Sequence, residues 1–138
     1  MSKALNNGSC RASQHGMNTK PYKIGIIQMS MSAEPKANMD KAISLLREAK
    51  KQGVQIACLP ELFLSYYFCQ SENHDYFKLA EPIPGPSTET LSKVAKELDM
   101  AIVASLFERR AAGVYHNTTV VLDADGANLG IYRKMHIP

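Results

Sequence analysis

The chain has 138 residues, of which 45% are hydrophobic and 21% are charged. This balance is typical of a globular protein, and the length is enough for one domain with a hydrophobic core. The net charge is only +3, and the lysines and arginines are spread along the chain. We therefore expect neither nucleic acid nor a membrane surface as a partner, since both require clustered positive charge.

The first twenty residues are polar and rich in Ser, Asn and Gly. They show neither a helical nor a strand period, so residues 1–20 are predicted to be a disordered extension and residues 21–138 a domain. A short apolar run at 22–30 predicts a buried strand. A helix follows, with Asn38 as its N-cap and Gly53 at its end, and residues 54–60 form a second strand. This order predicts a parallel pair with a right-handed crossover.

The second half of the domain contains more strands than helices. Residues 71–80 are predicted to form a short helix and residues 81–87 a proline-rich loop. Ser87 is predicted to cap an amphipathic helix whose buried face carries Leu91, Val94, Ala95 and Leu98. Three strands then follow at 100–109, 114–123 and 128–137, joined by hairpin turns. The predicted fold class is α/β.

The three cysteines are Cys10, Cys58 and Cys69, an odd number without C-x-x-C spacing. A disulfide framework is not expected, and the cysteine use favours a reducing, cytoplasmic compartment. Cys58 lies in an apolar run, where a free thiol packs as a small hydrophobic group. Nothing in the sequence places a cation or a base beside Cys69, so it is not expected to be a nucleophile.

Two charged residues lie at or near the ends of predicted strands. Glu61 comes directly after the second strand, and ligand sites in α/β sheets gather where strands end. Lys134 lies near the end of the fifth strand, where an ammonium could stabilise a developing oxyanion. Position alone favours simpler roles for both, a solvated acid and a surface lysine.

No metal site is predicted. His15, His74, His116 and His136 have no metal-ligand spacing. Residues 123–134 resemble a calcium loop, but the glycine is fourth rather than sixth and the twelfth position is a lysine. A hairpin turn is the better interpretation.

Several motifs together resemble one family. "YKIGIIQM", "LPELF" and "HNTTVVLDADGANLGIYRKMHIP", in this order, are similar to the front half of the nitrilase, or carbon–nitrogen hydrolase, superfamily. The resemblance covers residues 22–138. It implies an α-β-β-α sandwich, of which this chain would carry only the N-terminal half, with the inner face and one edge of its sheet uncovered.

The resemblance also implies a Glu–Lys–Cys triad without a metal or organic cofactor. By motif, Glu61 matches the glutamate that acts as general base and Lys134 matches the lysine that stabilises the oxyanion. The family's cysteine follows the lysine, whereas every cysteine of this chain precedes it. The 138-residue chain is therefore predicted to be inactive as given.

The substrate is expected to be a small carbamoyl compound or amide. "FLSYYFCQ" and "EPIPGPST" are most similar to the subgroup that cleaves N-carbamoylputrescine, in polyamine biosynthesis, to putrescine, carbon dioxide and ammonia. Tyr66, Tyr67 and His136 are candidates for lining the substrate pocket, although core packing explains the tyrosines equally well. β-Ureidopropionase, ω-amidase and nitrilase activities are the alternatives, because the fold does not determine the substrate.

Two expectations concern the whole gene product. We expect a fragment of a longer open reading frame, with a split gene or a truncated product as alternatives, and by resemblance a homo-oligomer at full length. A truncated relic would act at most as an interaction module.

Overall fold

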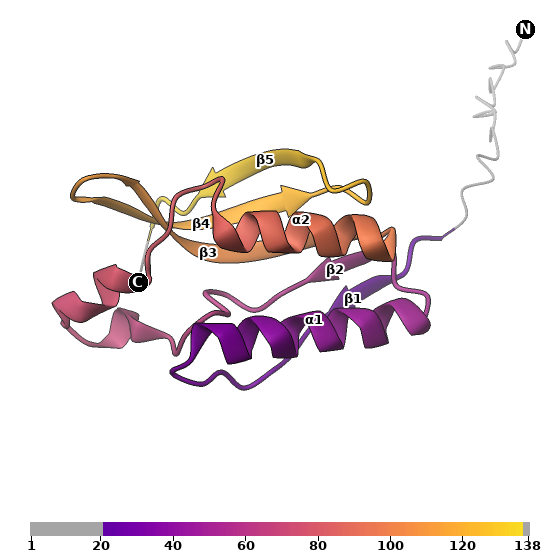
Figure 1. The fold of residues 1–138 in the computed structure, drawn as a ribbon, viewed down its shortest axis with the longest axis horizontal. Coiled ribbons are helices and arrows are strands. Elements are labelled where there is room, and N and C mark those ends of the chain that lie inside the picture. Colours follow the sequence, from indigo (N-terminus) through magenta and orange to yellow (C-terminus); the bar gives the residue numbers. More distant parts are fainter. Residues whose placement is uncertain (1–20, 137–138) are drawn as a thin grey trace, which may run out of the picture.

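The computed structural model describes residues 21–136. The expected disorder of residues 1–20 lies outside this range. The elements in chain order are β1 (Ile24–Ile26), α1 (Pro35–Lys51), β2 (Ile56–Cys58), the 3-10 helices η1 (Phe68–Gln70) and η2 (His74–Leu79), α2 (Pro86–Leu98), β3 (Ala101–Ala111), β4 (Val114–Leu122) and β5 (Asn128–Arg133) (Figure 1).

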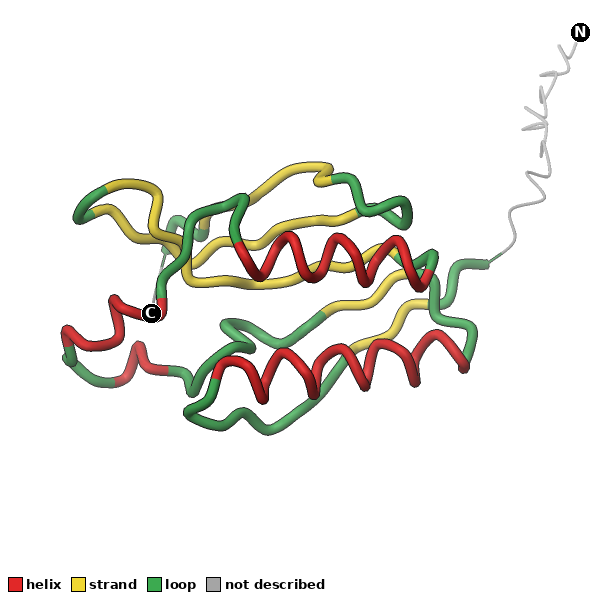
Figure 2. Tube along the Cα trace, viewed as in Figure 1, coloured by secondary structure: helices red, strands yellow, loops and turns green. Residues whose placement is uncertain are grey.

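The strands form one five-stranded sheet in the order β1-β2-β3-β4-β5. β1, β2 and β3 are parallel neighbours, and α1 and α2 provide the crossover connections between them (Figure 2). β4 and β5 are antiparallel and are added by hairpins. The predicted parallel pair and the hairpin-linked strands are confirmed, and the fold is α/β.

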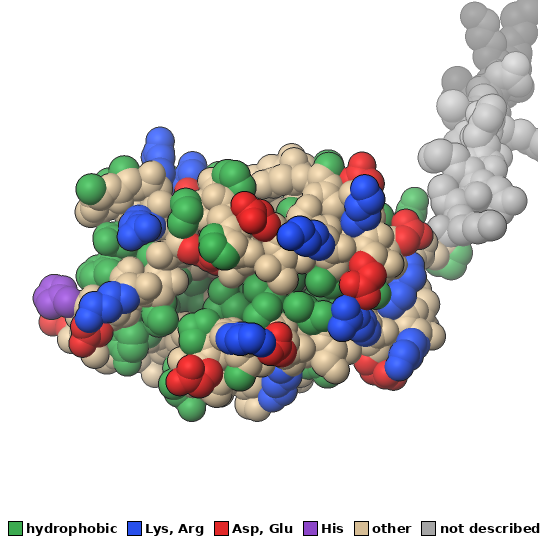
Figure 3. Space-filling view, viewed as in Figure 1, with side chains coloured by type: hydrophobic (Ala, Val, Ile, Leu, Met, Phe, Trp, Pro, Cys, Tyr) green, Lys and Arg blue, Asp and Glu red, His purple; other side chains and the backbone are tan. Residues whose placement is uncertain are grey.

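Both helices cover the same face of the sheet (Figure 1). Residues on this face alternate along β3, where Ile102, Ala104 and Leu106 are all buried. The helices contribute the apolar faces that the sequence predicted, including Leu46 of α1 and Leu91 of α2, both fully buried. Figure 3 shows charged side chains over the two helices and hydrophobic ones between them.

The opposite face of the sheet, called the open face below, has no helix over it within residues 21–136. Ile24 and Ile26 of β1 are 62% and 76% exposed there, and Tyr132 of β5 is 63% exposed. Such exposure is unusual for large apolar side chains in a sheet. The structure thus has one helix layer and one sheet layer, which are two of the four layers of the predicted sandwich.

Both predicted N-caps are wrong, because a proline begins each helix earlier. α1 begins at Pro35 after Glu34, and α2 begins at Pro86 after Gly85. Proline suits the first helical position, where its missing N–H leaves no hydrogen bond unmade. At α2 the cap is completed by Thr88, whose hydroxyl accepts from the Gly85 N–H at 2.7 Å and donates to the Gly85 carbonyl at 2.8 Å.

The first two strands and the last are shorter than predicted. Three residues of β1 and three of β2 pair in the sheet, and β5 ends at Arg133 rather than at 137. The segment 71–80 is a 3-10 helix over His74–Leu79. The calcium-like stretch is a hairpin turn, as expected, in which Gly126 has φ of +88° and packs against Ser92 of α2.

Asn38, the residue predicted to cap α1, instead joins the helix to two loops. It is 2% exposed, and its Oδ1 accepts from the Ser32 N–H at 2.8 Å. Its Nδ2 donates to the carbonyls of Ser32 and Leu64, both at 2.9 Å. Leu64 lies in the turn that begins at Glu61, so Asn38 helps to hold that turn against α1.

We predict that Asn38→Ala lowers the free energy of unfolding by about 2–3 kcal/mol, because it leaves buried partners without hydrogen bonds. Urea denaturation followed by circular dichroism measures the change. Glu48→Ala, on an exposed part of the same helix, is the control and should change stability by less than about 0.5 kcal/mol. Equal effects of the two substitutions would show that Asn38 has no special structural role.

Candidate active site

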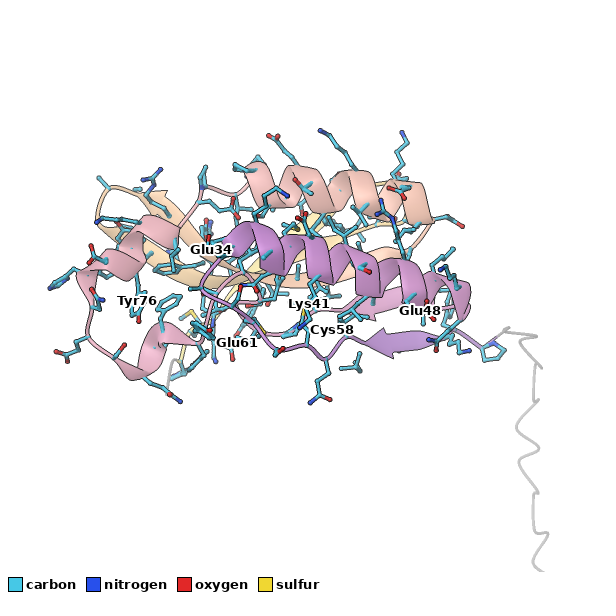
Figure 4. The ribbon with its side chains drawn as sticks, turned by 60° about the horizontal axis from the view of Figure 1, so that its bottom comes forward. Glu34, Lys41, Glu48, Cys58, Glu61 and Tyr76 are labelled. Carbon is cyan, nitrogen blue, oxygen red and sulfur yellow. The ribbon has the colours of Figure 1, made fainter. Side chains whose placement is uncertain are left out.

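Glu61 is positioned by a tight turn after β2. Pro60 follows the end of the strand, and Leu62 has φ of +49°, a left-handed conformation that is rare outside glycine. Leu62 and Phe63 are buried, at 3% and 0% exposure, and anchor the turn in the core. Glu61 therefore remains at the surface of the open face, while its neighbours point inward. Figure 4 labels Glu61 and Cys58, which lie along the path from β2 into this turn.

Lys134 is positioned by β5, the edge strand. Its backbone N–H donates to the Asn117 carbonyl at 2.9 Å, which continues the pairing with β4 one residue beyond Arg133. Side chains alternate along the strand, so Lys134 shares the open face with Tyr132. Arg133 points to the helix face, where it forms a bidentate ion pair with the buried Glu108.

The structure brings the two predicted catalytic residues into direct contact. The Lys134 Nζ lies 2.9 Å from the Glu61 Oε1, although 73 residues separate them in sequence. The Lys134 side chain is 34% exposed and the Glu61 side chain 43% exposed, so the pair remains accessible to a small molecule.

Asn117 also holds this carboxylate, and Ser105 in turn holds Asn117. Asn117 of β4 donates from Nδ2 to Glu61 Oε1 at 2.6 Å, and Ser105 of β3 donates to the Asn117 Oδ1 at 3.0 Å. The Ser105 Oγ in turn accepts from the Leu62 N–H at 3.2 Å. Neither Asn117 nor Ser105 was predicted from the sequence. The available signal was that Asn117 and Thr119 are two residues apart on β4 and so lie on one face of the strand.

A cavity of about 550 Å³ opens over this pair. His136, a candidate pocket residue from the sequence, is among the residues that line it. Tyr66 and Tyr67 are not among its lining residues, and Tyr66 is 60% exposed. The complete wall consists of Cys58, Leu59, Glu61, Val103, Ser105, Asn117, Thr119, Tyr132, Lys134 and His136.

Cys58, expected from its apolar run to pack as a small hydrophobic group, lies in the cavity wall. Its side chain is on the open face of β2 and half-buried. Its Sγ lies 3.6 Å from the Leu59 carbonyl. Within residues 21–136, neither Cys58 nor Cys69 forms a hydrogen bond with Glu61, so the carboxylate is not placed to deprotonate either thiol.

The charges of the pair stabilise each other. The hydrogen bond from Lys134 lowers the pKa of Glu61, and the bond from Asn117 acts in the same direction against partial burial. The hydrogen bond to Glu61 raises the pKa of Lys134. Partial burial raises the pKa of the nearby Tyr67, and the charges of Cys69 and Glu61 add to this effect. At neutral pH Glu61 is therefore an anion and Lys134 a cation.

The described residues contain no cluster of three or more His, Cys, Asp or Glu side chains able to hold a metal ion. His74 lies on η2 and is exposed. His116 of β4 pairs with Glu108 of β3, so it lies on the helix face, opposite to the face that carries Lys134. No helix within residues 21–136 combines the length and the apolar character that crossing a bilayer requires. The chemistry available in the cavity is that of a carboxylate that can accept a proton and an ammonium that can bind an anionic oxygen.

Comparison with known proteins identifies the family of this α/β domain. The carbon–nitrogen hydrolase profile matches residues 23–138. N-carbamoylputrescine amidases from Oryza sativa subsp. japonica and Arabidopsis thaliana are 40% and 41% identical over 116 residues, which is 83% of this chain and 38% of each relative. The ω-amidase NIT2 of Bos taurus is 40% identical over 117 residues, which is 84% of this chain and 41% of that protein.

Among solved structures, a carbon–nitrogen hydrolase from Helicobacter pylori G27 has a TM-score of 0.80 and 38% identity, and the match covers 85% of this chain and 40% of that one. The fold and the sequence therefore define one class of protein, the α/β domains of the nitrilase superfamily. This chain belongs to the carbon–nitrogen hydrolase family. It spans about two fifths of the length of the relatives that it matches.

We predict that Lys134→Met raises the pKa of Glu61, because it removes the hydrogen bond that lowers this pKa most. A carbon-detected NMR titration of the glutamate carboxyl groups measures the change. Lys36→Met, which removes an exposed ion pair with Asp40 on α1, is the control and should leave Glu61 unchanged. An unshifted titration of Glu61 in Lys134→Met would contradict the pairing.

The pKa shifts of Glu61 and Lys134 determine how the free energy of unfolding changes with pH. The lowered pKa of Glu61 stabilises the folded chain fully above about pH 4.5, and this stabilisation is lost as the pH falls through the pKa of Glu61 in the folded state. The raised pKa of Lys134 stabilises the folded chain fully below about pH 10.5, and this stabilisation is lost as the pH rises through the pKa of Lys134 in the folded state. The difference in unfolding free energy between wild type and Lys134→Met should therefore be largest within this window and shrink outside it.

Proposed function

We propose that this chain provides the base and the oxyanion-stabilising residue of an amidohydrolase that cleaves a carbon–nitrogen bond, with N-carbamoylputrescine as substrate. The contact between Glu61 and Lys134 in an accessible cavity is the observation that carries the proposal. The identity of 40–41% to plant N-carbamoylputrescine amidases supports the choice of substrate.

The reaction uses the two charges in sequence. Glu61 accepts the proton of a cysteine thiol, and the thiolate attacks the carbamoyl carbon. As negative charge develops on the carbonyl oxygen, the Lys134 ammonium moves its hydrogen bond toward that oxygen. Glu61 then loses the bond that lowers its pKa and becomes a stronger base at the moment when it holds the proton.

The second half of the cycle returns this proton. Glu61 passes it to the leaving nitrogen as the carbon–nitrogen bond breaks and a thioester remains on the cysteine. Water, with Glu61 as general base, cleaves the thioester, which restores the thiol and releases a carbamic acid. The carbamic acid then breaks down to carbon dioxide and the second amine, so that both nitrogens leave the carbamoyl carbon. The net change is N-carbamoylputrescine and water to putrescine, carbon dioxide and ammonia.

The thiol of this mechanism comes from outside the 138 residues. Cys58 and Cys69 form no hydrogen bond with Glu61 within the described range, and by family resemblance the nucleophile follows the lysine in sequence. We therefore propose that the 138-residue chain alone does not hydrolyse the substrate.

An ω-amide is the second candidate substrate. The bovine ω-amidase is as similar to this chain as the rice N-carbamoylputrescine amidase, at 40% identity each. The choice between the two substrates then depends on residues outside the segment shared with these relatives, or on cavity residues that differ between this chain and each relative.

A hybrid enzyme tests the function directly. Residues 21–138 of this chain replace the corresponding segment of the Arabidopsis thaliana N-carbamoylputrescine amidase, and the unaltered plant enzyme is the control. We predict ammonia release from N-carbamoylputrescine by the hybrid and none by the 138-residue chain alone. A folded hybrid that releases ammonia only from an ω-amide would favour the second candidate. A folded hybrid inactive on both substrates would contradict the amidohydrolase proposal.

Two substitutions in the hybrid test the assigned roles. Glu61→Gln removes the base, and we predict a loss in kcat of about 10²-fold or more in a hybrid that circular dichroism shows to be folded at the assay temperature. Lys41→Gln, on the exposed side of α1, is the control and should leave kcat within about twofold of the hybrid. Turnover by Glu61→Gln equal to that of the hybrid would remove Glu61 from the mechanism.

A further inference from the structure

The hydrogen bonds around Glu61 all run in one direction. The Leu62 N–H donates to Ser105, the Ser105 hydroxyl donates to Asn117, and the Asn117 amide donates to Glu61. The series therefore starts at a backbone donor and ends at an anion, and every member points its proton toward the carboxylate. Hydrogen bonds aligned in this way polarise one another and strengthen the last bond.

The series also determines the orientation of the Asn117 side chain. The Ser105 Oγ already accepts from Leu62, so its own proton is directed to the Asn117 Oδ1 at 3.0 Å. With Oδ1 held there, only Nδ2 faces Glu61. The reversed amide would place one oxygen against another and lose the bond of 2.6 Å. Asn117 is 6% exposed, so solvent does not easily replace these contacts.

The carboxylate of Glu61 is held on one side only. Its Oε1 accepts from both Asn117 and Lys134, at 2.6 and 2.9 Å. Within residues 21–136 its Oε2 has no hydrogen-bond partner. The two carboxylate oxygens are thus given different surroundings by the protein.

We propose that Ser105 and Asn117 are positioning residues for the base: they hold Glu61 by Oε1 so that Oε2 is the oxygen that accepts the proton. This inference rests on the proposed function for the role of Glu61 as base. The series of hydrogen bonds from Leu62 through Ser105 and Asn117 to Glu61, called the relay, can be tested without measuring hydrolysis. A hybrid that does not hydrolyse the substrate and a chain that lacks the relay therefore give different results.

The side-chain amide of Asn117 provides the direct test. In a ¹⁵N NMR titration of the 138-residue chain, we predict that the Asn117 amide protons shift upfield as Glu61 becomes protonated, since the bond to the carboxylate weakens. Asn117 amide signals that do not follow the titration of Glu61 would overturn the proposal.

Ser105→Ala tests the relay one step further from the carboxylate. We predict a smaller pH-dependent shift of the Asn117 amide and a proton affinity of Glu61 about two- to fivefold higher, because the amide is no longer held. Ser105→Thr keeps the hydroxyl and should restore both values. Thr119→Val, in the same cavity wall but outside the relay, is the control. Equal effects of Ser105→Ala and Thr119→Val would overturn the proposal.

Asn117→Asp keeps the side-chain shape and provides a second test should Ser105→Ala fail to fold. It places a carboxylate against Glu61, so we predict a proton affinity of Glu61 at least tenfold higher. In the active hybrid, the same substitution should move the acidic limb of the kcat pH profile upward while KM changes less than about threefold. A pH profile that stays unchanged in this variant would show that Asn117 has only a structural role.

Discussion

The ion pair between Glu61 and Lys134 depends on the order of strands in the sheet. The glutamate follows β2 and the lysine follows the edge strand β5, and two further strands separate them. The gap is closed because Glu61 lies on a turn that packs beside Ser105 of β3, and Asn117 of β4 fills the remaining distance. A contact between residues 73 positions apart therefore requires nearly every element of the domain to be in place.

The two faces of the sheet divide structure from chemistry. On the helix face, the core and the ion pair between the buried Glu108 and the half-buried Arg133 stabilise the fold. On the open face, the carboxylate and the ammonium line a cavity together with Cys58 and His136. Because side chains alternate along a strand, neighbouring residues such as Arg133 and Lys134 have different roles. The exposed isoleucines of β1 show that this face has apolar area beyond the cavity.

Much of the fold could be predicted from the sequence, because the apolar periodicity of α1, α2 and the strands is strong. The helix starts could not, because Asn38 and Ser87 match the residue types of a cap, while prolines earlier in the chain begin the helices. For the site, motifs identified Glu61 and Lys134, but no local pattern could show that Asn117 lies between them. That information is in the pairing of β3, β4 and β5, which only the folded sheet contains.

If Glu61 and Lys134 act as one catalytic unit, a double-mutant cycle on kcat/KM will show it. The hybrid enzyme would be assayed for ammonia release as Glu61→Gln, Lys134→Met and the double variant. Residues that act as a unit are strongly non-additive. We predict that the double variant is no more than about threefold slower than the slower single variant. Losses that multiply, so that the double variant shows the product of the two single effects, would contradict it.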